Sequence, residues 1–158
     1  MPKLQEDKMT EAIQLKYFRA YELVSKQMFE LFGNGSLRMF SPDVLKSLDQ
    51  LRSYFGRPIY INSFMHDRIN GRQWSGLRSV KCPVGATMSA HKMGTAFDLH
   101  CQTEDELAEL SELIREYGRH FRIHRVEHYE HTLSREKGMY IHVEFGATMA
   151  DKVYYFHP

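Results

Sequence analysis

The sequence has little of several residue types that define particular protein classes. Only two of its 158 residues are cysteine, and one pair does not provide the disulfide framework of small secreted domains. We therefore expect Cys82 and Cys101 to be free thiols. Acidic and basic residues nearly balance, at 20 and 21, for a formal net charge of +1. This balance gives no indication of a nucleic-acid or membrane-surface partner.

Long apolar runs are also missing. No stretch approaches the length needed to cross a bilayer, and the charged residues 1–8 lack the apolar core of a signal peptide. We expect synthesis in the cytoplasm and no membrane partner. A chain of 158 residues can support one hydrophobic core. We expect a single domain spanning residues 1–158, present as a monomer.

Three stretches have apolar residues at the three- and four-residue intervals typical of amphipathic helices. Ser41-Pro42 provides an N-cap and a proline at the first position of the second helix. Thr103 and Glu106 form a capping box at the start of the third. The stretches are residues 10–32, 42–55 and 103–117, so the N-terminal part, about 10–56, is predicted to be helical.

Alternating apolar and polar residues predict short strands in the rest of the chain. The strands are expected at residues 57–62, 97–100, 121–127 and 139–145, with 153–156 as either an edge strand or a packed aromatic plug. In 121–127, simple alternation puts Ile123 and Val126 on opposite faces, so the pattern does not decide which face of this strand is buried. Helices packed against a small, mainly antiparallel sheet give the α+β fold class.

The segment 89–100 contains two residues that could bind a metal, His91 and Asp98. On the predicted strand, Asp98 faces away from its apolar neighbours because side chains alternate. The same alternation in 139–145 turns His142 away from the core. Neighbouring strands of this kind would bring His91, Asp98 and His142 together as two nitrogens and one oxygen. Such a set leaves a fourth position open, as in catalytic zinc sites.

The motif Ser-x-His-x-x-Gly-x-Ala-x-Asp, which begins at Ser89 and is followed later by His142-Val143-Glu144, resembles the zinc DD-peptidase family of metallopeptidases. This family includes D-alanyl-D-alanine carboxypeptidases, dipeptidases and phage L-alanyl-D-glutamate endolysins. Ser75-Gly76-Leu77-Arg78 and Val84-Gly85-Ala86 also look like the small phage-type branch. The resemblance covers about residues 59–145, and a metal-site core is expected at about 57–146.

This resemblance implies a hedgehog/DD-peptidase-like α+β fold with a Zn²⁺ ion held by His91, Asp98 and His142. It implies hydrolysis of peptide bonds in bacterial peptidoglycan, so the expected partner is a peptidoglycan stem peptide. Action at the cell wall after phage-type release would fit a chain without a signal peptide. Ser89 is expected to cap the turn or support His91 rather than to act as a nucleophile.

Relatives in the family use an arginine from the Ser-Gly-x-Arg element to bind the substrate carboxylate or to steady the developing oxyanion, a task suited to a planar guanidinium. Arg78 is the match in this sequence. The spacing from this element to the ligand motif is shorter than in many relatives, so Arg68 and Arg72 are alternative counterparts.

The general base is the point where the sequence departs from the family. Several branches carry an acid three residues before the last histidine ligand, and this position is Met139 here. Glu127 and Glu144 are the two candidate bases, with His128 and His131 as further candidates. Met139 also supports an alternative, a catalytically inactive zinc-binding domain of the same fold that serves as a phage structural or wall-binding protein.

Overall fold

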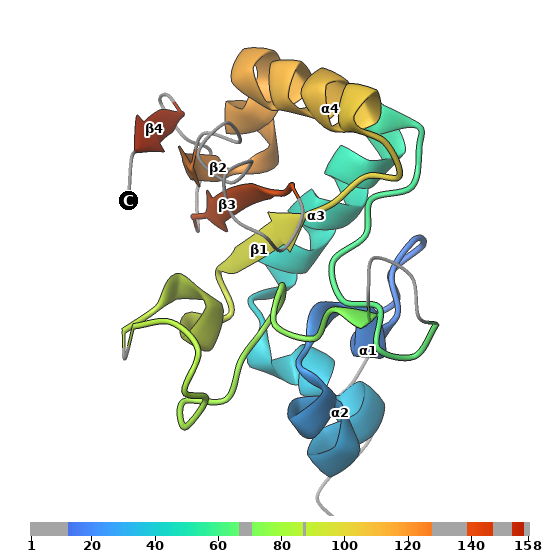
Figure 1. Cartoon of the computed structure of the whole chain (residues 1–158), viewed down its shortest axis with the longest axis vertical. Helices are drawn as coiled ribbons and strands as arrows, with labels where there is room; N and C mark the ends of the chain where they lie inside the picture. The colour runs from blue at the N-terminus through green and yellow to red at the C-terminus, as the bar shows by residue number, and fades with distance from the viewer. Residues whose placement is uncertain (1–12, 67–70, 87, 128–138, 147–152, 157–158) are drawn as a thin grey trace, which may run out of the picture.

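The computed structural model describes residues 13–66, 71–86, 88–127, 139–146 and 153–156, and this part of the chain has an α+β fold (Figure 1). The helices are α1 (Ala20–Leu23), α2 (Lys26–Phe32), α3 (Pro42–Phe55) and α4 (Glu104–Tyr117). Short 3₁₀ helices are η1 (Gly33–Met39), η3 (Ala90–Met93) and η4 (Gly118–Phe121). The strands are β1 (Ala96–Leu99), β2 (Ile123–Glu127), β3 (Ile141–Phe145) and β4 (Tyr154–Phe156).

A mixed four-stranded sheet organises the second half of the chain, in the order β1-β3-β2-β4. The central strand β3 runs antiparallel to β1 and to β2, whereas β4 joins β2 in parallel. The prediction of a mainly antiparallel sheet is therefore confirmed. Of the two possibilities for residues 153–156, the structure has the edge strand.

The hydrophobic core lies between one face of the sheet and helices α3 and α4, which flank the sheet in Figure 1. Removing one such aliphatic or aromatic side chain from water contributes about 1.5–3 kcal/mol. The fully buried members of this core include Leu45, Leu48, Leu51, Phe97, Leu99, Leu107, Leu110, Ile114, Ile141 and Val143. Among the described residues no helix has the length and apolar character to span a membrane.

Both predicted helix starts in this core are present. Pro42 opens α3 after Ser41, although the Ser41 side chain makes no capping hydrogen bond, and Gly56 ends the helix in the left-handed conformation, at φ 75°. Thr103 Oγ1 accepts a hydrogen bond from the Glu106 amide (3.2 Å). The Glu106 carboxylate accepts from the Gln102 amide instead of closing the predicted box on Thr103.

The prediction of one helix over residues 10–32 is wrong for much of its length. Residues 13–19 are not helical, because the Asp49 carboxylate on α3 accepts the amides of Lys16 and Tyr17 (both 3.0 Å). The helical remainder is divided at Val24, which forms an isolated parallel β-bridge with Leu77. Tertiary hydrogen bonds have replaced the helical ones that the periodicity predicted. The predicted start at residues 10–12 lies outside the described residues.

The prediction of a strand at 57–62 is also wrong, since within this segment only Tyr60 forms a β-bridge. Its amide and carbonyl exchange hydrogen bonds with His100, both at 2.8 Å. The amide of Asn62 turns away to the carbonyl of Glu22 (2.9 Å), and Pro58 has no amide hydrogen to donate. The ladder therefore stops at one pair.

Strand β2 contains a bulge that resolves the conflict between its two apolar residues. Ile123 lies opposite Phe145 and Arg125 opposite Glu144, so two residues of β2 span one step of β3. The extra residue is His124. It shifts the alternation so that Ile123 and Val126 are both buried.

Both cysteines, Cys82 and Cys101, are free, as predicted. Burial and the negative charge of Glu106 raise the pKa of the Cys101 thiol to about 12. A neutral thiol of this kind is a poor nucleophile and a poor metal ligand.

Gly76 holds the segment that precedes the metal motif against the junction of α1 and α2. The Leu77 amide donates to the Leu23 carbonyl and the Ser25 amide donates to the Leu77 carbonyl, both at 2.8 Å. A Cβ atom at position 76 would lie 2.0 Å from the Leu23 carbonyl oxygen. Only glycine allows the two backbones to approach this closely.

We expect Gly76→Ala to lower the free energy of unfolding by about 3 kcal/mol, because the clash is with backbone atoms that cannot rotate away. Gly35→Ala is the matched control, since nothing lies within 4 Å of a Cβ at that exposed position. It should change stability by less than about 1 kcal/mol. Urea unfolding followed by circular dichroism measures both. Equal effects of the two substitutions would show that the backbone contact at position 76 is unimportant.

Candidate metal centre

The first side chain of the site, His91, comes from the 3₁₀ helix η3. Ser89 caps this turn, because its Oγ accepts a hydrogen bond from the His91 amide (3.3 Å), which is the role predicted for it. Gly94 then ends the turn in the left-handed conformation, at φ 70°. The His91 Nδ1–H donates to the Gly76 carbonyl (3.0 Å). This bond leaves Nε2 as the nitrogen that can bind a metal.

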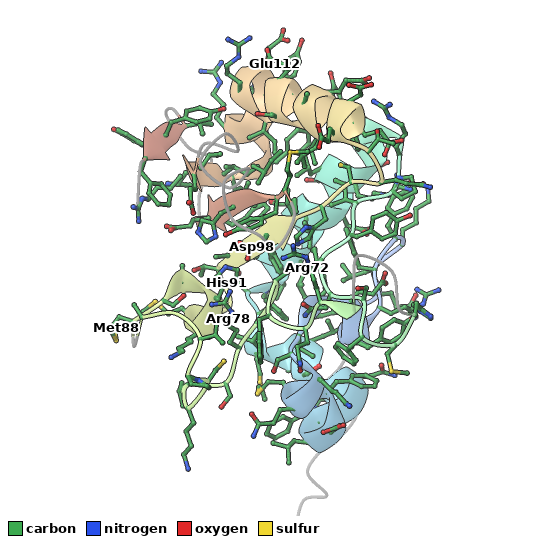
Figure 2. All side chains as sticks on the ribbon, in the orientation of Figure 1. Arg72, Arg78, Met88, His91, Asp98 and Glu112 are labelled. Carbon is green, nitrogen blue, oxygen red and sulfur yellow. The ribbon has the colours of Figure 1, made fainter. Side chains whose placement is uncertain are left out.

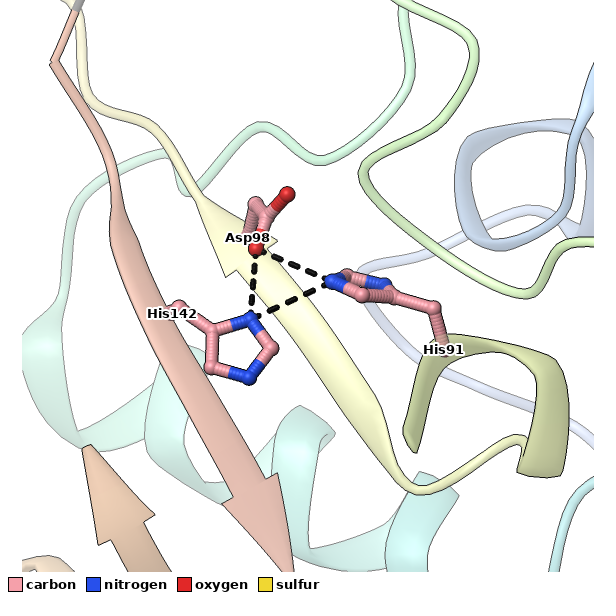
Figure 3. Close-up of side chains that lie close together, drawn as sticks. All are labelled: His91, Asp98 and His142. Atoms are coloured by element: carbon pink, nitrogen blue, oxygen red, sulfur yellow. Dashed lines mark hydrogen bonds and ion pairs between the residues drawn. The ribbon is translucent and has the colours of Figure 1, made fainter. Parts of the chain in front are cut away.

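Asp98 on β1 and His142 on β3 lie directly opposite each other in the sheet, and His91 reaches them from η3 (Figure 3). Asp98 Oδ1 lies 2.8 Å from His142 Nδ1 and 3.1 Å from His91 Nε2, and the two nitrogens lie 3.2 Å apart. Ligands at about 2.0–2.1 Å from a tetrahedral zinc lie about 3.3 Å from one another. The predicted cluster is thus assembled with spacings that suit a metal ion.

The cluster is withdrawn from solvent, with His91 3% and Asp98 7% exposed. Burial alone would raise the pKa of Asp98, but the charges and hydrogen bonds of His91 and His142 outweigh it and hold that pKa well below its usual value. For His142, burial lowers the pKa, but hydrogen bonds to the carboxylates of Asp98 and Glu144 outweigh this effect and raise the pKa to about 9. A carboxylate that stays ionised and faces two imidazoles favours the binding of a cation.

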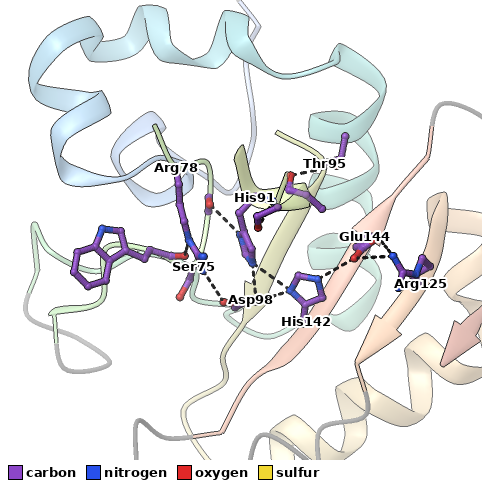
Figure 4. A network of polar contacts seen from close by, with 12 residues as sticks. Ser75, Arg78, His91, Thr95, Asp98, Arg125, His142 and Glu144 are labelled. Atoms are coloured by element: carbon purple, nitrogen blue, oxygen red, sulfur yellow. Dashed lines mark hydrogen bonds and ion pairs between the residues drawn. The ribbon is translucent and has the colours of Figure 1, made fainter. Parts of the chain in front are cut away.

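Glu144 contacts the far side of His142 (Figure 4). His142 Nε2 lies 3.3 Å from Glu144 Oε1, so its N–H can donate to the carboxylate and leave Nδ1 directed at Asp98. This hydrogen bond, opposed by burial, lowers the pKa of Glu144. Arg125 Nη1 donates to Glu144 Oε2 at 3.1 Å. A carboxylate behind a histidine is the usual arrangement for fixing the orientation of a metal ligand.

Arg78, only 9% exposed, is held from three sides. Its Nε donates to the Trp74 carbonyl (2.6 Å) and its Nη1 to the Val84 carbonyl (3.4 Å). Its Nη2 lies 3.7 Å from Asp98 Oδ2. The guanidinium therefore supports the oxygen of Asp98 that does not face the histidines.

Glu127 lies in the same row of the sheet as the cluster. It is the β2 partner of His142, which is itself opposite Asp98 on β1. Residues directly opposite one another share a face of the sheet, so the three side chains project to one side. Glu127 is 7% exposed. On the edge strand, Phe156 continues this row beside Glu127.

A second arginine, Arg72, labelled in Figure 2, interacts electrostatically with Asp98. Its backbone is fixed to Ser63, whose amide donates to the Arg72 carbonyl (2.7 Å). Its guanidinium lies over the Tyr140 ring, 5.9 Å from the centroid. Burial lowers the pKa of Arg72, and the attraction of Asp98 only partly compensates. The guanidinium is thus a partly desolvated cation that is attracted by the carboxylate of the cluster.

His100, which interacts electrostatically with Arg72, is held by two hydrogen bonds. Its Nδ1–H donates to the Met139 carbonyl (3.2 Å), and its Nε2 lies 2.9 Å from the Ser75 hydroxyl. Burial and the charge of Arg72 lower the pKa of His100 to about 4. Both ring nitrogens are engaged, which excludes His100 as a fourth ligand in this arrangement.

The sequence predictions missed Arg125 and Phe156 as members of the site. Alternation puts Arg125 on the same face of β2 as Glu127, two positions later. The sequence does not show the bulge that decides which face this is. Phe156 belongs to no sequence motif that would have indicated a place in the site. Arg68, His128 and His131, three further candidates, lie outside the described residues.

Comparisons of the chain with protein-family models, with curated proteins and with solved structures give no match. The site itself has two imidazole nitrogens and a carboxylate oxygen, all within 4.8 Å of one another, and could hold a metal ion. The side chains behind the donors direct them at a common point.

We expect the purified protein to contain about one divalent transition metal per chain, and His91→Ala to lose it, because two ligands bind far more weakly than three. Free metal at a hundred times its Kd stabilises the folded state by about 2.7 kcal/mol. A chelator should therefore lower the Tm of the unsubstituted protein and leave that of His91→Ala unchanged. Elemental analysis and thermal melting measure the two effects.

His120→Ala is the control, since this exposed histidine is not in the cluster. It should retain both the metal and the response to chelator. If His91→Ala kept a full complement of metal, the cluster would not be the binding site.

Proposed function

We propose that this chain is a zinc-dependent peptidase of DD-peptidase-like fold that hydrolyses peptide bonds in bacterial peptidoglycan. The observation that carries the proposal is the buried His91–Asp98–His142 cluster with Glu127 beside it in the same row of the sheet. The sequence motif that begins at Ser89 adds its resemblance to the DD-peptidases. A phage or prophage lysin that reaches the cell wall after release is the setting that this resemblance suggests.

The donor set supports Zn²⁺ as the metal. His91 Nε2, His142 Nδ1 and Asp98 Oδ1 would hold it, and three protein ligands of this type are typical of catalytic rather than structural zinc. Bound zinc would supply Lewis-acid chemistry, polarising the scissile carbonyl and making a water molecule more acidic.

Glu127 is the general base in this proposal, and Glu144 is the residue that orients His142. The Glu144 carboxylate is engaged by His142 Nε2 and by Arg125, on the side of the imidazole away from Asp98. Glu127 lies in the row of the metal ligands. Its carboxylate would take a proton from the attacking water and deliver it to the leaving amine.

Of the arginines, Arg72 is better suited than Arg78 to meet the substrate. Arg78 is engaged by two carbonyls and by Asp98 and is buried. Arg72 is partly exposed and interacts electrostatically with Asp98, and burial already makes its positive charge costly. A substrate carboxylate, or the developing oxyanion, would offset that cost. Arg78 then keeps Asp98 in position.

The second candidate function, an inactive zinc-binding domain of the same fold, is favoured by Met139. This residue occupies the position of the acid in several branches of the family, and it packs against the hydrophobic core. Both candidates bind zinc, and only turnover separates them.

The decisive test incubates the zinc-loaded protein with purified peptidoglycan and detects new amino termini by mass spectrometry. We expect defined cleavage that a chelator abolishes. Glu127→Gln should retain zinc and lose about 10²- to 10⁴-fold in kcat, because the amide cannot accept the proton. Zinc without cleavage on several wall types would favour the inactive domain.

Glu144→Gln is the matched control for this experiment. Losing the carboxylate behind His142 should weaken zinc binding by about 10- to 100-fold, while protein kept saturated with zinc retains more activity than Glu127→Gln. The opposite order of activities would make Glu144 the base.

Arg72→Gln should lower kcat/KM for a peptide with a free carboxylate near the scissile bond by about 10- to 100-fold, the range expected for a charged hydrogen bond. The corresponding peptide amide should show little change. Arg57→Gln is the control, because Arg57 also stacks on an aromatic ring, that of Phe55, and pairs with Glu109. Equal losses for acid and amide would exclude a carboxylate-binding role for Arg72.

A further inference from the structure

The edge strand β4 brings one side chain against the metal cluster. The Phe156 ring meets the His142 ring edge to face, with centroids 6.0 Å apart and planes at 88°. In the sheet, Phe156 is also the partner of Glu127 on β2. Phe156 therefore contacts a metal ligand and lies beside Glu127 in the sheet.

Phe156 also contacts the charged residue that lies behind the cluster. The Arg125 guanidinium lies over the Phe156 ring, 4.4 Å from its centroid. A guanidinium at this distance is attracted by the negative face of the ring. The Arg125 side chain is otherwise half exposed, at 51%, so the ring limits the conformations open to a long and flexible side chain.

These contacts form a continuous chain from the edge strand to the metal ligand. Phe156 supports Arg125, Arg125 Nη1 donates to Glu144 Oε2 (3.1 Å), and Glu144 Oε1 lies 3.3 Å from His142 Nε2. Figure 4 shows the last three of these residues connected in line with Asp98 and His91. Each step holds the next side chain in one orientation.

We propose that Phe156 is a positioning residue of the metal centre: through Arg125 and Glu144, and by direct contact, it holds His142 with Nδ1 directed at the metal. The strand β4 is thereby part of the site rather than an accessory to the sheet. The inference needs a bound metal but not peptidase activity, so it stands apart from the proposed reaction.

The test measures zinc affinity by competition with a chromophoric chelator, which requires no turnover. Phe156→Ala should weaken zinc binding about tenfold, at the lower end of the effects seen for residues behind a metal ligand. Phe156→Tyr keeps the aromatic face and should restore most of the affinity. Phe156→Leu fills much of the space without that face and should remain close to the alanine variant. It also provides a folded variant if alanine destabilises the strand.

Tyr155→Ala is the control on the same strand, because Tyr155 is 37% exposed and alternates to the face of the sheet opposite Phe156, Arg125 and Glu127. It should bind zinc within about twofold of the unsubstituted protein. The absorption spectrum of the Co²⁺-loaded protein, which reports ligand geometry, should change in Phe156→Ala and not in Tyr155→Ala. Equal losses in the two variants would reduce the role of Phe156 to strand stability and overturn the proposal.

The route of the effect is tested with Arg125→Gln alone and combined with Phe156→Ala. Since Phe156 and Arg125 both act on His142 through Glu144, the double variant should bind zinc only slightly more weakly than the single variant of lower zinc affinity. Fully additive losses would mean that Phe156 does not act through Arg125. If these variants behave as expected and peptidoglycan is not cleaved, the proposed reaction fails while the positioning role stands.

Discussion

The register between β1, β3 and β2 is the constraint on which the metal centre depends. Asp98, His142 and Glu127 are in one row because each lies opposite the next across the sheet. A slip of one residue in β3 would turn His142 to the opposite face. The register is fixed by the other face, where Phe97, Val143 and Val126 form the neighbouring buried row. The same apolar burial that stabilises the fold thus sets the geometry of the polar site.

The position of the remaining ligand, His91, depends on a different kind of contact, which is made by the backbone rather than by apolar side chains. The segment around Gly76 lies between α1 and β1. It hydrogen-bonds to Leu23 on one side and, through the Ser75 carbonyl, to the Asp98 amide on the other (2.7 Å). The Gly76 carbonyl then fixes the His91 ring. The close approach at Gly76 and the orientation of a metal ligand are therefore consequences of one backbone path.

Sequence reasoning succeeded where a strand or helix has one buried face. The alternation in 139–145 and the capping signals at Ser41 and Thr103 correspond to observed elements, and the three residues of the cluster were found from alternation and motif alone. It failed for residues 13–19, where a distant carboxylate on Asp49 captures backbone amides. No local pattern records such a contact.

The sequence also left the roles of Glu127 and Glu144 open, because it does not give the register across strands. In the structure Glu144 shares a strand with His142 and contacts its ring, whereas Glu127 belongs to the adjacent strand. Phe156 could not be found from the sequence for the same reason. Its relation to His142 exists only because β4 pairs in parallel beside β2.

The bulge at His124 has a consequence for how such a site can arise. In a regular β2, Ile123 and Glu127 would share a face, so a strand that buries the isoleucine would also turn the carboxylate into the core. One extra residue removes this conflict and lets a single five-residue strand serve the core at its start and the metal row at its end. An ordinary core strand can thus gain a polar site through one insertion, without giving up an apolar residue. In homologous chains, the length of this strand and the presence of an acid at its end should change together.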